Sequence, residues 1–566
     1  MRDIYKGAQR VVVWLGPVAP DNNLAFDTLR RLNGYWAEIS ERWAVDKLSV
    51  LKLGSFRDTL RQLFGTDAGQ HKDIEHDRRF DLQPDEITAL RDVLECPWWR
   101  RTWVIQEVCL AEEVVMAYGH GILSWEELSR GYLMAIGPGG LLTAIGATEE
   151  IECCQRMYQL KTMFQEMQQQ EKSEGLPSTG ETSPQHMAID MLTLIQTSNK
   201  FGTTRLHDRI YGVLGLAPAE TGRLIVPDYT IPVEECFQSA VISIITNTGN
   251  LDVFMDPTYR LKEGVDLPSW APHWGYDAFE SSENKAWGSA TPFTPHISIA
   301  ILADLFRQQD AKLSACGENS RCEPRIIDDS ILVLEGYIAD SVATIGPALD
   351  GKLDDDSEEK WAQYANQYTG ALPTAIPRII IQVLVRIATF PRCLLGWEEL
   401  AFAKPASPTK AEQESYMRVL LSNRMFQNVD ISLAIYQRDW SPLLKWARWL
   451  SPLKVLGARQ GASTIYNVVV GALTLFMAAV SSTKSHLVTI GQAMESRLAR
   501  TDAGRLARLP SAARVGDRIA LLRGSKMPIV VRPMKNRWEF VGCCYVDGIM
   551  YGEGWHVDSV QKMEFI

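Results

Sequence analysis

The sequence predicts an α+β protein with several domains, and three observations support this fold class. The chain has 566 residues, which is more than one hydrophobic core normally organises. Its first part alternates strand-like apolar runs with helical segments, as α/β domains do. Its last part has short apolar runs broken by glycine and proline, which is typical of a small barrel or sandwich. We expect a partial α/β domain at 1–150, a helical middle region at 151–325 and a β-rich domain at 326–566.

The composition indicates a globular protein without a nucleic-acid-binding surface. Apolar residues make up 46% and charged residues 22% of the chain, which is ordinary. The net charge of −11 argues against general nucleic-acid binding, which needs a basic surface. The ten cysteines include no CxxC pair or zinc-ligand spacing, and neither phosphate-binding glycine motif occurs. We therefore expect no metal, no cofactor and, without a signal peptide, a cytoplasmic location.

The first predicted domain alternates strands and helices. The β-branched run VVVWLG predicts a buried strand that leaves its sheet at Gly16-Pro17. Ser124 and Glu127 have the spacing of a capping box, which predicts a helix start. We expect further helices at 22–64, 86–95 and 98–110 and a second strand at 114–120, with Pro97 separating the last two helices.

The remaining segments differ sharply in composition. Residues 165–187 are rich in Gln, Glu, Ser, Gly and Pro, so they predict a disordered insertion. We expect helical structure at 208–218 and a helix followed by a short strand at 233–254. A strand at 331–346 opens the β-rich domain, and a helical insertion at 374–480 interrupts it. The final strands are expected in 515–566, within RIALLRG, PIVVRP, RWEFVGCCYV and GIMYG.

The stretch WWRRTWVIQEV is the main candidate for chemistry. On one continuous helix, Trp99, Trp103 and Gln106 share a face. In a structural interpretation the tryptophans are core, and Gln106 and Glu107 bind buried backbone groups or a neighbouring arginine, because buried polar groups need partners. In a functional interpretation Glu107 is a catalytic acid or base, or a ligand contact. Both interpretations stay open here.

The order of motifs along the chain resembles the fungal heterokaryon-incompatibility (HET) domain proteins. The motifs are MRDIYKGAQRVVVWLG, WWRRTWVIQEV, DRIYGVLGLA, VPDYTIPVEECFQSAV, LPSWAPHW, GDRIALLRGSKMPIVVRP and FVGCCYVDGIMYGEG. The first two are similar to the second half of the HET domain, through Ile4, Tyr5, Ala8, Val11, Trp14, Leu15, Gly16, Trp99, Arg101, Trp103, Gln106 and Glu107. The later motifs are similar to the helical middle and β-rich end of large family members, through Asp208, Tyr211, Gly215, Asp228, Tyr229, Trp270, Gly516, Asp517, Gly524, Pro528, Arg532, Gly542, Tyr545, Gly548, Gly552 and Glu553.

The sequence departs from the family pattern in two ways. His273 stands where the family pattern PSW-x-x-D-W has an aspartate. The blocks Y-x-x-L-S-Y-x-W-G and D-x-x-C-I-N-Q, which open a HET domain, do not occur. We therefore expect a partial HET domain that lacks its N-terminal half.

The resemblance implies a cytoplasmic signalling protein for allorecognition, one that triggers incompatibility and programmed cell death. It implies protein partners, with self-association as one form, and a TIR-like α/β domain. The main expectation is no enzymatic activity, with NAD cleavage through Glu107 as an alternative. A second alternative is a membrane-associated effector formed by 374–480, where Lys445 and Arg448 lie in an amphipathic, tryptophan-rich stretch.

Overall fold

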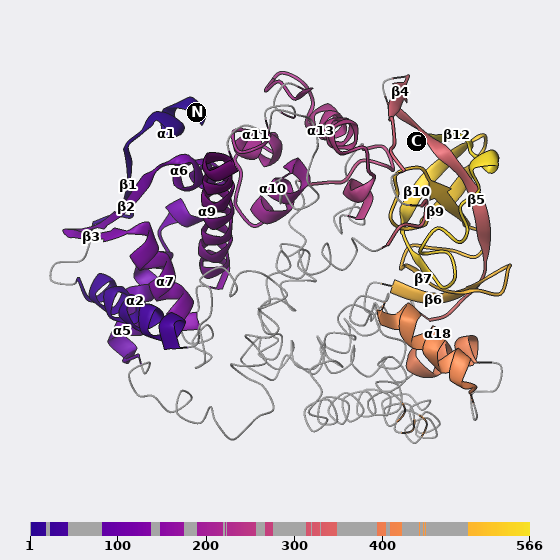
Figure 1. The fold of residues 1–566 in the computed structure, drawn as a ribbon, viewed down its shortest axis with the longest axis horizontal. Coiled ribbons are helices and arrows are strands. Elements are labelled where there is room, and N and C mark those ends of the chain that lie inside the picture. The colour runs from indigo at the N-terminus through magenta and orange to yellow at the C-terminus, as the bar shows by residue number, and fades with distance from the viewer. Residues whose placement is uncertain are drawn as a thin grey trace, which may run out of the picture. The chain divides into compact units, whose positions relative to one another are not determined.

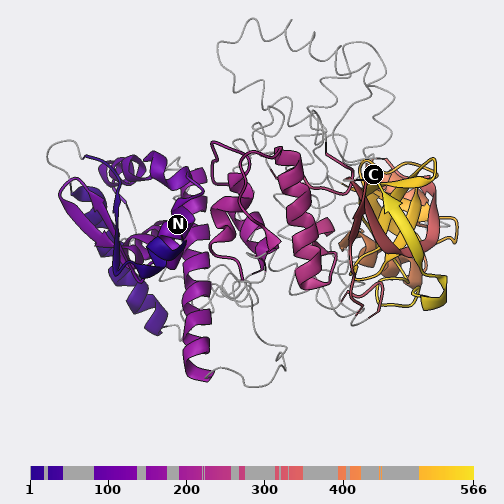
Figure 2. The ribbon, with the colours of Figure 1, turned by 90° about the horizontal axis from the view of Figure 1, so that it is seen from above.

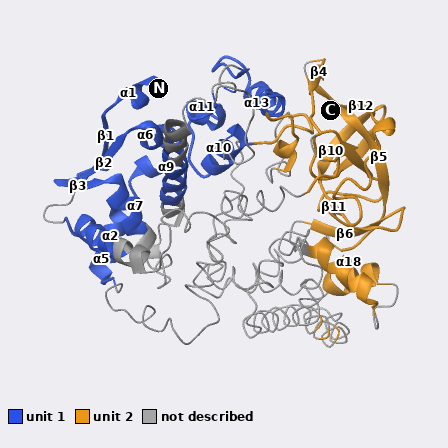
Figure 3. Cartoon of the chain, viewed as in Figure 1, with its two compact units in different colours: residues 1–247, 274–277, 296–305 blue, residues 248–273, 278–295, 306–566 orange. Residues whose placement is uncertain are grey.

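The computed structural model describes residues 2–17, 23–42, 82–136, 148–174, 190–218, 224–255, 267–274, 313–317, 320–328, 330–347, 393–402, 408–421 and 496–566, with Thr221, Ser441, Lys445 and Arg448 besides. These residues form two compact units, which Figure 3 distinguishes by colour. Unit 1 contains the described residues up to Asn247 together with Trp274, and unit 2 contains the others. Helices and sheets both occur, so the α+β class is confirmed. The domain boundary expected at 150 lies inside unit 1.

Unit 1 combines a small sheet with helices (Figure 1). Its elements are α1 (Arg2–Gly7), β1 (Arg10–Trp14), α2 (Leu24–Arg42), α5 (Pro84–Leu94), η2 (Pro97–Arg100), α6 (Val104–Leu110), β2 (Glu113–Tyr118), β3 (Gly121–Ser124), α7 (Trp125–Ile136), α9 (Thr148–Glu174), α10 (Met191–Ser198), α11 (Asp208–Leu214) and α13 (Val233–Thr248).

The sheet of unit 1 has the order β1-β2-β3, with β1 parallel to β2 and β2 antiparallel to β3. Val13, Met116 and Leu123 lie on its buried face, and α2 and α7 pack against each other and against this sheet. The prediction of a buried strand at VVVWLG is wrong in one respect. Val12 and Trp14 are 63% and 58% exposed, because β1 is an edge strand and described helices cover only one face.

Local sequence signals in unit 1 are mostly confirmed. The Glu127 N–H donates to Ser124 Oγ at 3.1 Å, and the Ser124 N–H donates to Glu127 Oε2 at 2.9 Å, which is the predicted capping box. The helix α9, however, runs into the predicted disordered insertion as far as Glu174. Glutamine, glutamate, methionine and lysine are good helix formers, which explains this extension. Residues 175–187 of that insertion, and 43–64 of the helix expected at 22–64, lie outside the described residues.

Unit 2 is built mainly of strands. Its elements are η3 (Asp252–Met255), β4 (Arg325–Ile327), β5 (Ile331–Ile345), α18 (Lys410–Leu421), β6 (Ser496–Thr501), β7 (Leu506–Pro510), β8 (Arg518–Leu522), β9 (Ile529–Met534), β10 (Arg537–Cys543), β11 (Tyr545–Val546), η7 (Val557–Ser559) and β12 (Gln561–Phe565). Where a short strand was expected at the end of 233–254, the chain forms the 3-10 helix η3. The stretch GIMYG, also expected as a strand, forms turns and bends.

Strand β5 closes a barrel in unit 2. The sheet order runs β5-β12-β10-β9-β8, and β8 pairs with β5 again, so these strands form a ring (Figure 2). A register shift between Ile338 and Asp340 bends β5, and its last residues pair with β6 instead. Gly336 lies at the closing seam, where a Cβ atom would stand 2.3 Å from the Leu521 carbonyl oxygen. The sequence predicted either a barrel or a sandwich, and the pairing of β8 with β5 shows that the domain is a barrel.

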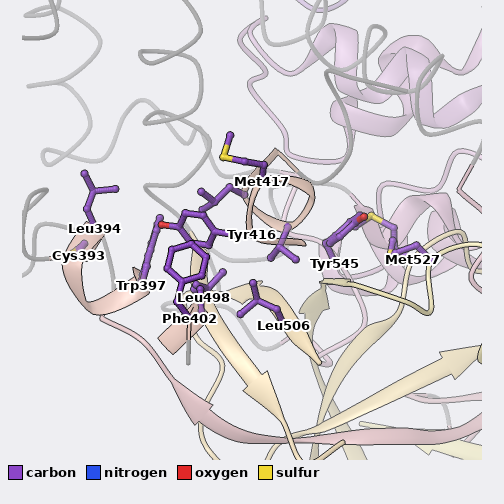
Figure 4. Packing of buried hydrophobic residues seen from close by; sticks show 14 of the residues in the cluster. Cys393, Leu394, Trp397, Phe402, Tyr416, Met417, Leu498, Leu506, Met527 and Tyr545 are labelled. Carbon is purple, nitrogen blue, oxygen red and sulfur yellow. The ribbon is translucent and has the colours of Figure 1, made fainter. Parts of the chain in front are cut away.

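Two helical segments pack on the β6–β7 side of unit 2, one at 393–401 and the other α18. Figure 4 shows Trp397, Tyr416 and Leu506 within the apolar cluster that joins them to the sheet. Arg500 donates to the carbonyl oxygens of residues 400 and 401 at 2.7 and 2.9 Å, and Arg508 donates to that of residue 420 at 2.8 Å. These arginines satisfy carbonyl groups at helix C-termini, where positive charge is favourable.

Most of the predicted insertion at 374–480 lies outside the described residues, including the apolar run 465–480. The described parts of it are the two helical segments and a few single residues. Among those, Arg448 forms an ion pair with the buried Glu398 of unit 2. No helix within the described residues is long and apolar enough to cross a membrane. The membrane alternative stays a prediction.

Candidate functional site

The stretch WWRRTWVIQEV is two short helices with a break between them. The predicted continuous helix at 98–110 is wrong, since η2 ends at Arg100 and α6 begins at Val104. Arg101 is extended, with φ −80° and ψ 127°, and forms an isolated parallel bridge with Gly202. The Thr102 N–H and hydroxyl both donate to the Gly202 carbonyl oxygen, at 3.1 and 3.0 Å. This non-local pairing competes with helical hydrogen bonds and causes the break.

The first two tryptophans of the stretch are core. Trp99 is completely buried, and its ring packs against Trp98, Trp125 and Tyr132 at centroid distances between 5.0 and 6.4 Å. Its indole N–H donates to the Val93 carbonyl oxygen at 2.9 Å. Edge-to-face and tilted ring contacts at such distances stabilise aromatic cores. Trp103 is half-buried at the start of α6, so the three tryptophans do not form the single stripe that the helix prediction implied.

Gln106 joins α6 to α11. The side chain is buried, and its amide N–H donates to the Gly212 carbonyl oxygen at 2.7 Å. A Cβ atom on Gly215 would lie 2.4 Å from Gln106 Oε1, so the motif glycine leaves room for this amide. Two residues that the resemblance singled out in separate motifs are therefore one packing unit. The structural interpretation is confirmed for Gln106, whose partner is a buried backbone group.

We predict that Gly215→Ala lowers the free energy of unfolding by about 1–3 kcal/mol, because it pushes Gln106 away from the Gly212 carbonyl and leaves buried polar groups without partners. The backbone at Gly215 is helical, with φ −63°, so alanine causes no backbone strain there. Urea denaturation measures the change. In a Gln106→Ala background the same substitution should cost almost nothing, and an undiminished cost there would contradict this explanation.

Glu107 lies in a small polar cluster with three neighbours from the same region. The Trp98 indole N–H donates to Glu107 Oε2 at 3.1 Å. The pKa of Tyr5 is raised, first by burial and then by the charge of Glu107 and a hydrogen bond to it, while Arg101 opposes the shift. The helices α1 and α6 and the break after η2 thus bring a phenol, a carboxylate and a guanidinium together. Sequence reasoning named Tyr5, Arg101 and Glu107 but missed Trp98 as a partner.

Buried cations hold the helices around this cluster. Lys161 on α9 donates to the carbonyl oxygens of Val108 and Ala111, both at 3.0 Å, at the C-terminal end of α6. In Figure 1 α9 runs beside α6, in agreement with these bonds. Burial lowers the pKa of Lys161, yet the helix carbonyls favour its charged form. Nothing in the sequence marks this residue, since a lysine in a helix is usually solvated.

Two arginines donate hydrogen bonds to backbone carbonyl groups at the C-terminal end of α10. Arg156, which is fully buried, donates to the Thr197 carbonyl oxygen at 2.8 Å and to Asn199 Oδ1 at 3.0 Å. Arg209 donates to the carbonyl oxygens of Asn199 and Phe201 at 2.9 and 2.5 Å. Arg209 belongs to the motif DRIYGVLGLA, so this motif binds the loop that carries Gly202. The loop in turn fixes the break in WWRRTWVIQEV.

The motifs DRIYGVLGLA and VPDYTIPVEECFQSAV meet in an aromatic and acidic cluster. Tyr229 donates its hydroxyl to Asp208 Oδ1 at 2.6 Å, and Tyr211 donates to the Asp228 carbonyl oxygen at 3.1 Å. The two tyrosine rings meet edge to face at 5.2 Å, and the Arg205 guanidinium lies 5.3 Å from the centre of the Tyr229 ring. Burial, together with neighbouring acidic groups, raises the pKa of both phenols, that of Tyr211 to about 12. Both phenols are therefore neutral donors near pH 7.

Most of the remaining family-motif residues lie in unit 2, and their contacts are structural. Asp517 accepts two hydrogen bonds from Arg532, at 2.9 and 3.0 Å. Trp270 is fully buried and donates to the Ser330 carbonyl oxygen at 2.9 Å, and His273 is also buried. Positive φ angles occur at Gly16 of unit 1 and at Gly516, Gly524, Gly542, Gly548 and Gly552. Pro528, Tyr545 and Glu553 complete the set: the first accepts from the Cys544 N–H, the second is buried in the cluster of Figure 4, and the third accepts from the Tyr551 N–H.

No group of His, Cys, Asp and Glu side chains suited to a metal ion occurs among the described residues. All ten cysteines are free thiols, and most are buried. The chemical groups gathered around Glu107 are the one polar cluster that the sequence had connected with catalysis.

The chain is an α+β protein. Its N-terminal motifs connect short helices through hydrogen bonds, and its C-terminal motifs form a closed barrel. Residues 1–107 match the family model described as heterokaryon incompatibility protein (HET), and residues 469–565 match that described as Het-6 beta-barrel domain. The chain belongs to the HET family of proteins.

One curated relative supports the same assignment. The chain is 22% identical, over 633 aligned positions, to heterokaryon incompatibility protein 6, OR allele, of Neurospora crassa. The alignment covers 100% of this chain and 79% of that protein. No solved structure matches the chain.

Proposed function

We propose that this chain is a fungal allorecognition protein of the cytoplasm, which signals heterokaryon incompatibility and programmed cell death when non-self partners meet. The observation that carries the proposal is the occurrence of both a HET region and a Het-6 barrel in one chain that aligns along its whole length with an incompatibility protein. Fold likeness alone does not establish function, so the proposal needs a direct test.

Within this proposal the two units have different roles. Unit 1 is the signalling part, which acts by regulated assembly with protein partners, including further copies of the chain. Unit 2, with its barrel and the helical segments packed on it, is the sensor or regulator. The motif residues support this division, since the described ones form hydrogen bonds and packing contacts within their own unit.

Inducible expression of the full chain in a filamentous fungal host tests the proposal. We expect loss of most colony-forming units on induction, together with a larger assembled fraction on sedimentation of the lysate. The control is Asp517→Ala, which should be poorly folded and therefore inactive. Normal growth with no change in self-association, at an expression level confirmed by immunoblotting, would contradict the proposal.

NAD cleavage is the alternative that one observation favours. Glu107 is half-buried beside Tyr5, Trp98 and Arg101, and a carboxylate among such groups is suited to acid–base chemistry on a bound nucleotide. This alternative gives unit 1 a TIR-like activity. It predicts that induction depletes cellular NAD and that Glu107→Gln abolishes the depletion, whereas Glu112→Gln, at an exposed neighbouring position, does not. Unchanged NAD during growth arrest would reject the enzyme and leave the signalling proposal standing.

A further inference from the structure

Strand β1 is an edge strand, and only one of its two sides pairs with another described strand. The Leu15 N–H donates to the Ala117 carbonyl oxygen at 2.9 Å, so Leu15 points its backbone groups toward β2. Backbone groups alternate in direction along a strand, and Val11 and Val13 therefore face β2 as well. The N–H and C=O groups of Arg10, Val12 and Trp14 point the other way, toward the edge. Within the part of the chain that the structure describes, no strand pairs with that edge.

The opposite edge of the same sheet is treated differently. At β3 the Arg30 guanidinium donates to the Ile122 carbonyl oxygen at 2.6 Å, so a charged side chain blocks strand addition there. Charged side chains and loops are the usual ways in which a protein protects a sheet edge. A sheet with one edge protected and the other open for pairing has a defined side for association.

The solvent-facing side chains beside the free edge are apolar. The register places Trp14, Ala117 and Ile122 in one row across the sheet, and Val12 beside Val115 in the next. Val12, Trp14 and Ile122 are each more than half exposed. At the start of the strand, Arg10 forms an exposed ion pair with Glu113 at 2.8 Å. The edge therefore ends in a cation at Arg10 and in a large aromatic ring at Trp14.

We propose that the free edge of β1 pairs with β1 of a second copy of this chain, antiparallel and centred on Val12. A two-fold axis through Val12 places Val12 opposite Val12 of the second copy, and Arg10 opposite Trp14 of the second copy. In this register the outward backbone groups of all three residues face each other, so each facing pair exchanges both of its hydrogen bonds. The guanidinium of one copy lies over the indole of the other, which is a favourable cation–π arrangement.

The sequence RVVVW is self-complementary only in this arrangement. A shift by one residue would turn the apolar side chains of the added strand to the wrong face. A shift by two residues would leave an outward backbone group unpaired at each end and would separate the arginine from the tryptophan. An isologous contact also closes on itself, so it gives a dimer with a continuous sheet. The inference specifies the surface for the assembly in the proposed function, and it rests on that proposal only for its biological role.

A charge exchange at the two-fold axis tests the pairing on the purified full chain by light scattering after size exclusion. The wild type should have twice the mass of one chain. Val12→Glu and Val12→Lys each bring like charges together across the axis and should each be monomeric. An equimolar mixture of the two variants should regain the dimer mass, because glutamate then faces lysine. Val12 is exposed, so neither substitution should disturb folding, which circular dichroism checks.

Ile122→Lys is the matched control, since it adds the same charge on the same exposed face but at the other edge of the sheet. It should remain dimeric. A monomeric wild type at tens of micromolar, dimeric single Val12 variants or a mixture that stays monomeric would each overturn the inference. A monomeric wild type that still arrests growth would leave the proposed function standing, whereas a dimer without any growth effect would contradict that function and keep the interface.

Discussion

Replacing Asp517 with alanine is expected to lower the free energy of unfolding by about 3–5 kcal/mol. Asp517 is 3% exposed and accepts two hydrogen bonds from the Arg532 guanidinium. It also accepts the Arg514 backbone N–H at 2.8 Å, so it ties the turn before β8 to the neighbouring strand β9. Alanine removes all these acceptors and leaves the arginine, whose side chain is 19% exposed, without its main counter-ion. An unpaired charge in such a place is far more costly than the loss of an exposed pair.

Chemical denaturation of the purified chain, followed by tryptophan fluorescence, measures this loss. The control is Glu564→Ala, which breaks the ion pair between Glu564 and Arg537 on the same barrel. Both of those side chains are about two-fifths exposed, and exposed pairs contribute less than about 1 kcal/mol. Equal losses for the two variants would show that the Asp517–Arg532 pair is no more than a surface contact.

Features that depend on neighbours in sequence could be predicted. The capping box at Ser124, the strand β5 and the strands β8 to β10 all carry local signals, such as cap spacing or alternating burial, and the structure confirms them. In these places local preference and tertiary packing favour the same conformation.

Features that depend on distant contacts could not be predicted. The break at Arg101 follows from Gly202, about a hundred residues away, and nothing in WWRRTWVIQEV marks it. The pairing of β8 with β5 that closes the barrel depends on a bend within β5, and the sequence left barrel and sandwich open. Lys161 donates hydrogen bonds to carbonyl groups at the C-terminal end of α6 because α9 passes beside that helix. In each case a tertiary contact satisfies a backbone group that the local sequence leaves open.

The candidate site shows the same division. Motif resemblance identified Gln106, Gly215 and Asp208, but their partners became visible only in the fold. Gln106 and Gly215 contact each other, and Asp208 accepts from Tyr229. The motif residues therefore serve mainly in structural contacts and not as reacting groups. Glu107 alone keeps both interpretations, because its partners Trp98 and Tyr5 serve equally well in a structural cluster and in a binding site.

Trp99→Ala is expected to lower the free energy of unfolding by about 3–5 kcal/mol, which is usual when a large aromatic side chain is removed from a core. Trp99 is fully buried among Trp98, Trp125 and Tyr132, so alanine leaves a cavity and an unsatisfied Val93 carbonyl group. Trp99→Phe keeps an aromatic ring and should lose roughly half as much. Thermal and chemical denaturation of both variants measure the difference.

The same two variants test whether Trp99 acts only through packing in the core or also has a direct functional role. If Trp99 acts only through packing, growth arrest in the fungal host should fall in proportion to the folded fraction, and Trp99→Phe should retain most of it. Glu107→Gln provides the comparison, because Glu107 is half-buried and its loss should leave the fold largely intact. A stable Trp99→Ala protein without activity would contradict the core assignment. A stable Glu107→Gln protein without activity would instead make the polar cluster beside Tyr5 the working part of WWRRTWVIQEV, with the tryptophans as its support.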